Sequence, residues 1–143
     1  MPEKPVYFID STTFISAVDK DSESHSHCLE LLDMVAKKRL KAATSLETLE
    51  ETLFILSRLI PHRDALRVVR NLMLLPGLTR HTMGYSILMQ AMEIMEIYPL
   101  RPKDAINVAT MLENDIAFIV SEDTDYDETG LVQRIHPRNL VEP

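Results

Sequence analysis

Residues 115–123 read DIAFIVSED, and this stretch decides the fold, because a short apolar run leads directly into an acidic turn. Such a run, bounded by polar residues, is typical of a buried strand. The run VYFID at residues 6–10 has the same form and also ends in an aspartate. Acids at the carboxyl ends of parallel strands meet in one crevice, so we expect Asp10 and Asp123 to converge there.

Strands and helices are expected to alternate along the chain. Apolar residues at helical spacing predict helices over residues 14–18, 22–38, 45–60, 64–72, 82–97 and 103–114, and two further short strands are expected over 41–45 and 133–136. This alternation predicts a single-domain α/β/α sandwich over residues 1–143, with a short central parallel sheet and right-handed crossovers.

The helix over residues 45–60 has the clearest start. Thr44 and Glu47 form a T-x-x-E capping-box pattern, and an apolar stripe follows until Pro61. On a helical wheel Glu50 lies at the edge of that stripe and Glu51 lies on the far side. Periodicity therefore favours Glu50 as the acid that faces a pocket.

Composition limits the classes of function. The net charge of −7 argues against a protein that coats nucleic acid, although it allows a nuclease whose acids are metal ligands. The single cysteine, Cys28, excludes an internal disulfide. No basic segment leads into a long apolar one, so we expect neither a secretory signal nor a membrane span, and a cytoplasmic location.

Four acids stand near the ends of predicted elements: Asp10, Glu51, Asp104 and Asp123. Carboxylates that share one pocket raise each other's pKa unless a cation holds them, so a divalent metal site is the natural interpretation. Helix capping is the alternative for Asp10, and a first-turn interaction with the helix dipole is the alternative for Asp104.

Together these segments resemble the PIN-domain ribonucleases, and the VapC toxins in particular. FIDSTTFI (residues 8–15) is similar to the family's first strand, aspartate and helix start. TSLETLEETL (44–53) is similar to its S-x-x-T-L-x-E pattern, which selects Glu51 over Glu50. RPKDAINVATMLE (101–113) and the following DIAFIVSEDTDYDE (115–128) resemble the stretch in which an aspartate opens a helix and a strand leads to T-x-D-x-D-F.

The resemblance implies an Mg²⁺- or Mn²⁺-dependent endoribonuclease in which a metal-activated water cleaves RNA. It implies that the catalytic and metal-binding residues are Asp10, Glu51, Asp104 and Asp123, and that the carboxylates are oriented by Thr12, Ser121 and Asp125. Arg101 and Lys103 are expected to contact the substrate, because they stand next to Asp104 and must lie near the pocket. It also implies a toxin with a cognate antitoxin protein. The alternative is a catalytically idle PIN-like module that binds RNA or protein.

Other metal and phosphate chemistries fit the residues less well. A haloacid-dehalogenase phosphatase requires a second aspartate where Thr12 stands. A calcium loop beginning at Asp123 would need glycine where Glu128 stands. His27 and Cys28, with His25, lack a fourth zinc ligand and are expected to be ordinary surface residues.

The helix over residues 82–97 is more apolar than one core-facing stripe requires. Apolar side chains form two rows, one of Tyr85, Leu88, Met92 and Met95 and the other of Ile87, Ala91 and Ile94. We therefore expect a second buried face, in a homodimer or against an antitoxin that uses the methionine-rich surface. The alternative is a central helix that is covered within its own subunit.

Overall fold

The computed structural model describes residues 4–141. Its strands are β1 (Val6–Ile9), β2 (Lys41–Ser45), β3 (Leu78–His81), β4 (Phe118–Val120) and β5 (Gln133–Ile135). Its α-helices are α1 (Ser11–Ser16), α2 (His25–Ala36), α3 (Leu46–Leu59), α4 (His62–Met73), α5 (Tyr85–Ile97) and α6 (Pro102–Glu113), and two 3₁₀ helices follow, η1 (Thr124–Glu128) and η2 (Pro137–Asn139).

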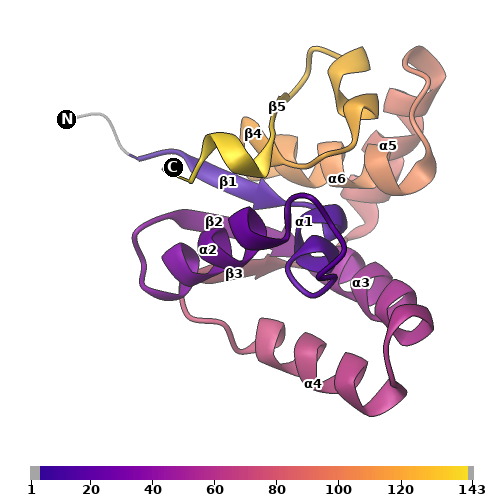
Figure 1. The fold of residues 1–143 in the computed structure, drawn as a ribbon. Helices are drawn as coiled ribbons and strands as arrows, with labels where there is room; N and C mark the ends of the chain where they lie inside the picture. The colour runs from indigo at the N-terminus through magenta and orange to yellow at the C-terminus, as the bar shows by residue number, and fades with distance from the viewer. Residues whose placement is uncertain (1–3, 142–143) are drawn as a thin grey trace.

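The five strands form one parallel sheet in the order β3-β2-β1-β4-β5, with helices on both faces (Figure 1). This arrangement confirms the predicted α/β/α fold class. From β1, strands β2 and β3 follow in sequence towards one edge of the sheet, whereas β4 and β5 lie on the other side of β1. The strand order therefore reverses between β1 and β4, and open α/β sheets bind their ligands at the carboxyl end of such a reversal.

Two apolar clusters cover the two faces of the sheet. Helices α1 to α4 supply one cluster, in which Leu31, Leu49 and Leu56 are completely or almost completely buried. Helices α5 and α6 supply the other cluster, around Val108 and Met111. Helices α3 and α6 lie in different layers. Their N-terminal turns are nevertheless close together, because Lys103 near the start of α6 lies 3.6 Å from Glu51 on α3.

The N-terminus of α3 differs from the predicted capping box. Ser45, and not Thr44, is the N-cap, and its Oγ accepts a hydrogen bond of 3.0 Å from the Thr48 amide. The Thr44 hydroxyl instead donates to the Ile9 carbonyl at 2.8 Å and ties β2 to β1. The prediction was wrong by one residue because Thr44 is still part of the strand, and Glu47 is consequently not needed for capping.

Strand β3 has no counterpart among the predicted elements. It is an edge strand of four residues, LTRH, whose polar side chains give no apolar run. Gly77 precedes it with a φ of +81°, and a Cβ atom at this position would lie 2.2 Å from the Val35 carbonyl oxygen. Only glycine therefore fits the close approach between this turn and the end of α2.

Cys28 was expected at the surface but is completely buried. It lies on the stripe of α2 that also carries Leu31 and Val35, both of which are buried. Burial raises the pKa of its thiol to about 12, so the group is inert near neutral pH. Across residues 4–141, no helix has both the length and the apolar character that a membrane span requires.

Candidate active site

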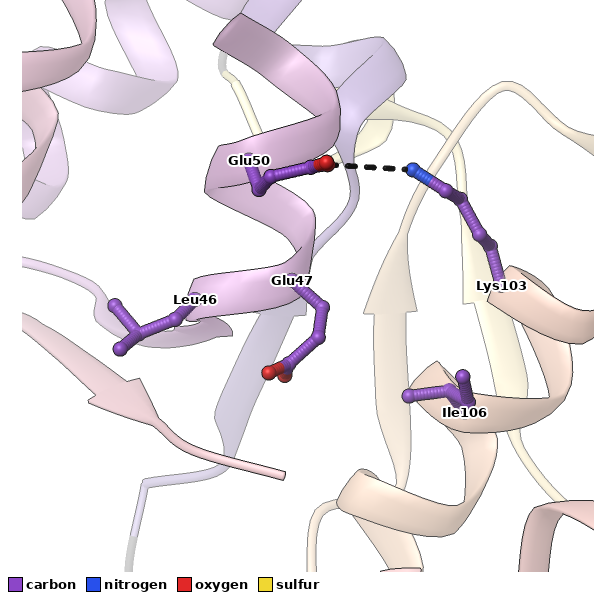
Figure 2. Close-up of a pocket in the computed structure, with 5 residues that line it drawn as sticks. All are labelled: Leu46, Glu47, Glu50, Lys103 and Ile106. Carbon is purple, nitrogen blue, oxygen red and sulfur yellow. Dashed lines mark ion pairs between the residues drawn. The ribbon is translucent and has the colours of Figure 1, made fainter. Parts of the chain in front are cut away.

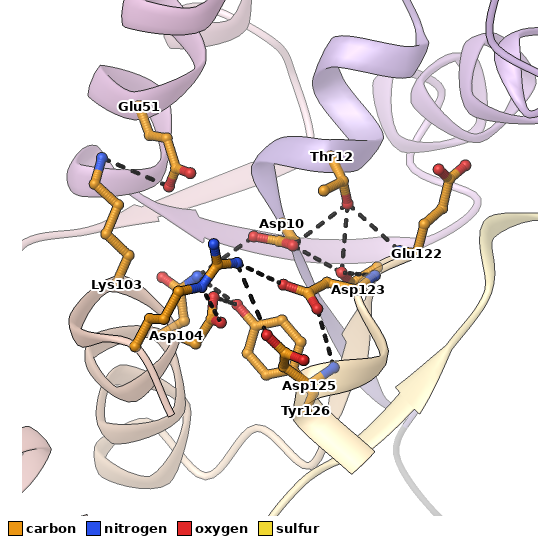
Figure 3. Close-up of polar contacts among 12 residues, drawn as sticks. Asp10, Thr12, Glu51, Lys103, Asp104, Glu122, Asp123, Asp125 and Tyr126 are labelled. Atoms are coloured by element: carbon orange, nitrogen blue, oxygen red, sulfur yellow. Dashed lines mark hydrogen bonds and ion pairs between the residues drawn. The ribbon is translucent and has the colours of Figure 1, made fainter. Parts of the chain in front are cut away.

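The acidic residues predicted from the sequence gather at the carboxyl edge of the sheet, where the strand order reverses (Figure 3). Asp10 follows β1, and its amide donates to the Val120 carbonyl at 3.1 Å, which joins it to the end of β4. Asp104 lies in the first turn of α6 and Asp123 is the N-cap of η1. Parallel pairing of β1 with β4 thus brings together acids that are distant in the sequence.

Asp10 is the most deeply placed of these acids, with 4% of its surface exposed. Its Oδ2 accepts hydrogen bonds from Ser121 Oγ at 2.7 Å and from Thr12 Oγ1 at 3.3 Å. Burial raises the pKa of the Asp10 carboxyl to about 6, against the opposing effect of the hydrogen bond from Ser121. Two hydroxyls therefore fix the orientation of a carboxylate that is poorly solvated.

Asp104, Asp123 and Asp125 form a tighter group, in which one carboxylate oxygen from each lies within 4.8 Å of the others. Asp104 Oδ1 accepts a hydrogen bond of 3.1 Å from Tyr126, whereas its buried Oδ2 has no hydrogen-bond donor among the described residues. Burial, followed by the charge of Asp123, raises the pKa of Asp104. These oxygens concentrate negative charge in a confined space.

Arg101 places a positive charge over this group. Its guanidinium lies 3.2 Å from Asp123, 3.7 Å from Asp104 and 3.9 Å from Asp125. The neighbouring carboxylates, Asp104 foremost, raise the pKa of Arg101. Because the Arg101 side chain is 72% exposed, these ion pairs are well solvated and a stronger cation can replace them.

A buried polar network behind the acids was not predicted from the sequence. Asn107 Nδ2 donates to Asp10 Oδ1 at 3.4 Å and to the Tyr126 hydroxyl at 2.9 Å, while its Oδ1 accepts from Thr48 at 3.1 Å. One side chain thus links Asp10 to the tyrosine that holds Asp104. The available signal was spacing, because Asn107 stands three residues after Asp104 and shares its buried helix face.

The structure distinguishes the tandem glutamates. Lys103 Nζ lies 3.6 Å from a carboxylate oxygen of each, but the Glu51 side chain is 23% exposed and that of Glu50 is 71% exposed. Glu51 also lines a pocket of about 390 Å³ together with Arg101, Pro102, Lys103 and Asp104. Glu51 therefore borders the acid site, as the family pattern indicated. Glu50 also faces a pocket, as the helical wheel indicated, but that pocket is lined by Leu46, Glu47, Lys103 and Ile106 and by none of the aspartates.

The acidic turn after β4 does not have the arrangement of a calcium loop. Asp127 forms an ion pair of 3.0 Å with Arg134 instead of joining Asp123 and Asp125. The other residues of the site fit a divalent cation well. Hard cations prefer oxygen ligands, and the converging carboxylates supply them, including Asp104 Oδ2, which accepts no hydrogen bond from the described residues and lies 3.7 Å from the Arg101 guanidinium.

Fold and site together define a parallel α/β domain with an acid cluster at the point where the strand order reverses. The family model for the PIN domain matches residues 7–131, and the chain therefore belongs to the PIN domain family.

Solved structures share this fold at low sequence identity. VapC20 of Mycobacterium tuberculosis, described as a toxin that cleaves the sarcin-ricin loop, has a TM-score of 0.72 and 20% identity over 85% of this chain and 92% of its own. The DNA-bound VapBC of Salmonella typhimurium has a TM-score of 0.71 and 13% identity over 93% and 98%. No curated protein sequence matches the chain.

Proposed function

We propose that this protein is an endoribonuclease that hydrolyses RNA phosphodiester bonds and depends on Mg²⁺ or Mn²⁺. The observation that carries the proposal is the cluster of Asp104, Asp123 and Asp125, whose carboxylate oxygens lie within 4.8 Å of one another beside the buried Asp10. Four carboxylates at one sheet edge are electrostatically unfavourable without a cation. The chemistry that such a cation supplies when bound is neutralisation of phosphate charge and activation of water.

The proposed ligands of the cation are Asp10, Glu51, Asp104 and Asp123. Thr12 and Ser121 orient the Asp10 carboxylate through their hydroxyls, at 3.3 Å and 2.7 Å. Asp125 was expected only to orient other carboxylates, but its own carboxylate joins the cluster and we add it as a candidate ligand.

Arg101 and Lys103 are proposed to contact the RNA. Both side chains line the pocket beside Asp104, and both are more than half exposed. A bound metal ion would neutralise the acids, and the Arg101 guanidinium, which now lies 3.2 Å from Asp123, would then be available to bind a phosphate oxygen. Arg101 and Lys103 would then hold the RNA backbone against the acid cluster.

The cellular role that we propose is that of a toxin, acting as one domain in the cytoplasm and inhibited by an antitoxin protein. This proposal draws support from the similar structures. VapC20 is described as an RNA-loop-cleaving toxin, and other similar folds were solved as toxin–antitoxin complexes, including one from Klebsiella pneumoniae with a TM-score of 0.65 and 16% identity.

We further propose that the protein forms a homodimer through α5. Its residues Ile87, Ala91 and Ile94 are buried against the core, but the second apolar row remains exposed, with Tyr85 at 84% and Met92 at 47%. Its own subunit therefore covers one face of the helix and leaves the other face exposed. A second copy of the chain would bury this row.

The test is cleavage of a labelled RNA over a Mn²⁺ titration, with EDTA as the metal-free condition. We expect cleavage that requires metal and that Asp104→Asn abolishes. Asp33→Asn is the matched control, because Asp33 forms an exposed ion pair with Lys37 on α2. Cleavage that persists in EDTA, or in the Asp104→Asn variant, would overturn the proposal, and an absence of cleavage under all metals would favour the idle module.

A further inference from the structure

A pocket of about 490 Å³ lies between α3 and α6, beside the acid site (Figure 2). It is lined by Leu46, Glu47, Glu50, Lys103 and Ile106, and it is called the Glu47 pocket. Lys103 lines this pocket and also the pocket that contains Glu51 and Asp104. The two hollows therefore adjoin at Lys103, and a strand of RNA bound at the acids would pass the Glu47 pocket.

Glu47 lies in the first turn of α3, where the helix dipole favours an acid, but its side chain does not cap the helix. Ser45 and Thr48 cap α3 between themselves, through a hydroxyl–hydroxyl contact of 2.9 Å and the amide hydrogen bond at 3.0 Å. Glu47 Oε1 is buried and has no hydrogen-bond donor among the described residues. Figure 2 shows the carboxylate extending from α3 into the space that faces Ile106 on α6. A buried acceptor without a donor is unfavourable, so a ligand that donates hydrogen bonds would satisfy it.

We propose that the Glu47 pocket binds a guanine base of the RNA substrate. This inference rests on the proposed ribonuclease function. Single-stranded RNA is recognised through unstacked bases that pack on side chains and form hydrogen bonds along their Watson–Crick edges. Ile106 and Leu46 provide apolar surface for the base, and Glu47 provides the polar contact.

The chemistry of a carboxylate selects guanine among the four bases. The two oxygens of Glu47 accept two parallel hydrogen bonds, and only guanine presents two adjacent donors, N1–H and the N2 amino group, on its Watson–Crick edge. Adenine and cytosine present one amino group next to an acceptor nitrogen, and uracil presents one N–H between two carbonyl oxygens. Each of these edges would place an acceptor atom of the base against an oxygen of the Glu47 carboxylate, which would weaken binding.

Binding can be tested with four uridine pentamers that differ only at the central base, guanine, adenine, cytosine or uracil. Affinities would be measured with Ca²⁺ in place of Mn²⁺, since Ca²⁺ also takes oxygen ligands. We expect the guanine pentamer to bind roughly 10- to 100-fold more tightly than the others, the range that a good bidentate base contact gives. Glu47→Gln should remove this preference, and Glu30→Gln, on the exposed part of α2, should keep it.

Three results would overturn the inference. The first is equal binding of all four pentamers, and the second is a guanine preference that survives Glu47→Gln. The third uses N-acetyl-arginine amide as a small cationic probe and is tighter binding of this probe than of the guanine pentamer at the Glu47 pocket. The last result would identify the pocket as a receptor for a cationic side chain. Thermal melts keep the test interpretable, because Glu47 is only partly buried and Gln is about as good a helix former as Glu, so the melting temperature of Glu47→Gln should stay close to that of the wild type.

Cleavage mapping separates this inference from the proposed function. If Mn²⁺-dependent cleavage occurs without preference for guanine near the cut, the ribonuclease proposal stands and the Glu47 pocket does not read guanine. If the guanine pentamer binds selectively but no RNA is cut, the base pocket stands and the ribonuclease proposal fails. When both are right, Glu47→Gln lowers kcat/KM by roughly 10- to 100-fold for guanine-containing sites only.

Discussion

The Asp10 carboxyl is buried, yet its hydrogen bonds come from two hydroxyls and one amide instead of a fixed positive charge. Its pKa in the folded, metal-free protein is therefore raised, from 3.8 to about 6. Between these values the folded state binds more protons than the unfolded state. The free energy of unfolding consequently falls as the pH rises through this window.

The first prediction is that the metal-free protein is more stable near pH 4.5 than near pH 7. The shift from 3.8 to about 6 is expected to make a difference of about 2 kcal/mol between these two pH values for this group. Asp10→Asn should remove this dependence and stabilise the protein at pH 7, because the charge is gone while an acceptor for Ser121 remains. Urea unfolding in EDTA at several pH values measures both effects. A drop in stability at pH 7 for Asp10→Asn would mean that the acid serves as a structural cap.

The second prediction concerns the glutamates that contact Lys103 from either side. Glu51→Gln should reduce RNA cleavage by at least roughly 10- to 100-fold, since even residues outside the direct metal contacts have effects of this size. Glu50→Gln should cost little, because its side chain is 71% exposed. The two variants should be assayed together at saturating and at limiting Mn²⁺. The helical-wheel argument would be restored if Glu50→Gln were the more damaging change.

The sequence was sufficient to predict that Asp10, Asp104 and Asp123 lie at one edge of the sheet, since each stands beside the end of an element that is recognisable from its apolar residues. It was insufficient for Asn107 and Tyr126. The sequence does not indicate the partners of a polar residue within a buried helix face. The partners of Asn107 are Thr48 on α3, Asp10 between β1 and α1, and Tyr126 on η1. Only the tertiary structure shows that the side-chain amide of Asn107 forms hydrogen bonds with residues from three separate parts of the chain.

Among the elements, the long helices and the two central strands were predictable because their apolar residues repeat over several turns or form unbroken runs. Strand β3 was not predictable from periodicity. Its four residues alternate in burial only weakly, and its position depends on the turn at Gly77. That turn is fixed by contact with the carbonyl of Val35, a residue more than forty positions earlier in the chain.

The third prediction tests this turn by comparing two glycines with positive φ. Gly130→Ala requires only the left-handed conformation, at about 1–2 kcal/mol, because no atom lies within 4 Å of the added Cβ. Gly77→Ala has the same cost and must also displace the Val35 carbonyl, 2.2 Å away. We expect Gly77→Ala to lower the free energy of unfolding by at least about 2 kcal/mol more than Gly130→Ala in parallel urea titrations. Equal losses would show that α2 and the turn shift apart easily.

For the whole molecule, the exposed apolar row of α5 is the feature that the folded monomer leaves unexplained. Tyr85, Leu88, Met92 and Met95 are all at least 39% exposed, on a helix that packs closely on α6. This row lies on the layer formed by α5 and α6, away from the helices that precede it in the chain.

The fourth prediction is that Met92→Lys converts a dimer into a monomer. A lysine at the centre of a self-complementary apolar interface places two like charges close together. Sedimentation velocity over a concentration series measures the change. Leu74→Lys is the control, because Leu74 is 78% exposed at the end of α4, in the other layer. A wild-type protein that is monomeric at all concentrations would leave α5 available to a different partner.

The contact between Ser121 and Asp10 spans 111 positions of sequence. A ribosome that has just completed β1 to β3 has produced most of one apolar layer, but it has not yet made Asp104, Asp123 and Asp125, three of the five proposed metal ligands. The acid site can form only after β4 has left the exit tunnel and paired with β1. Nuclease activity should therefore be absent from every shorter nascent chain, so an antitoxin would have until that late stage of synthesis to be present before any RNA can be cut.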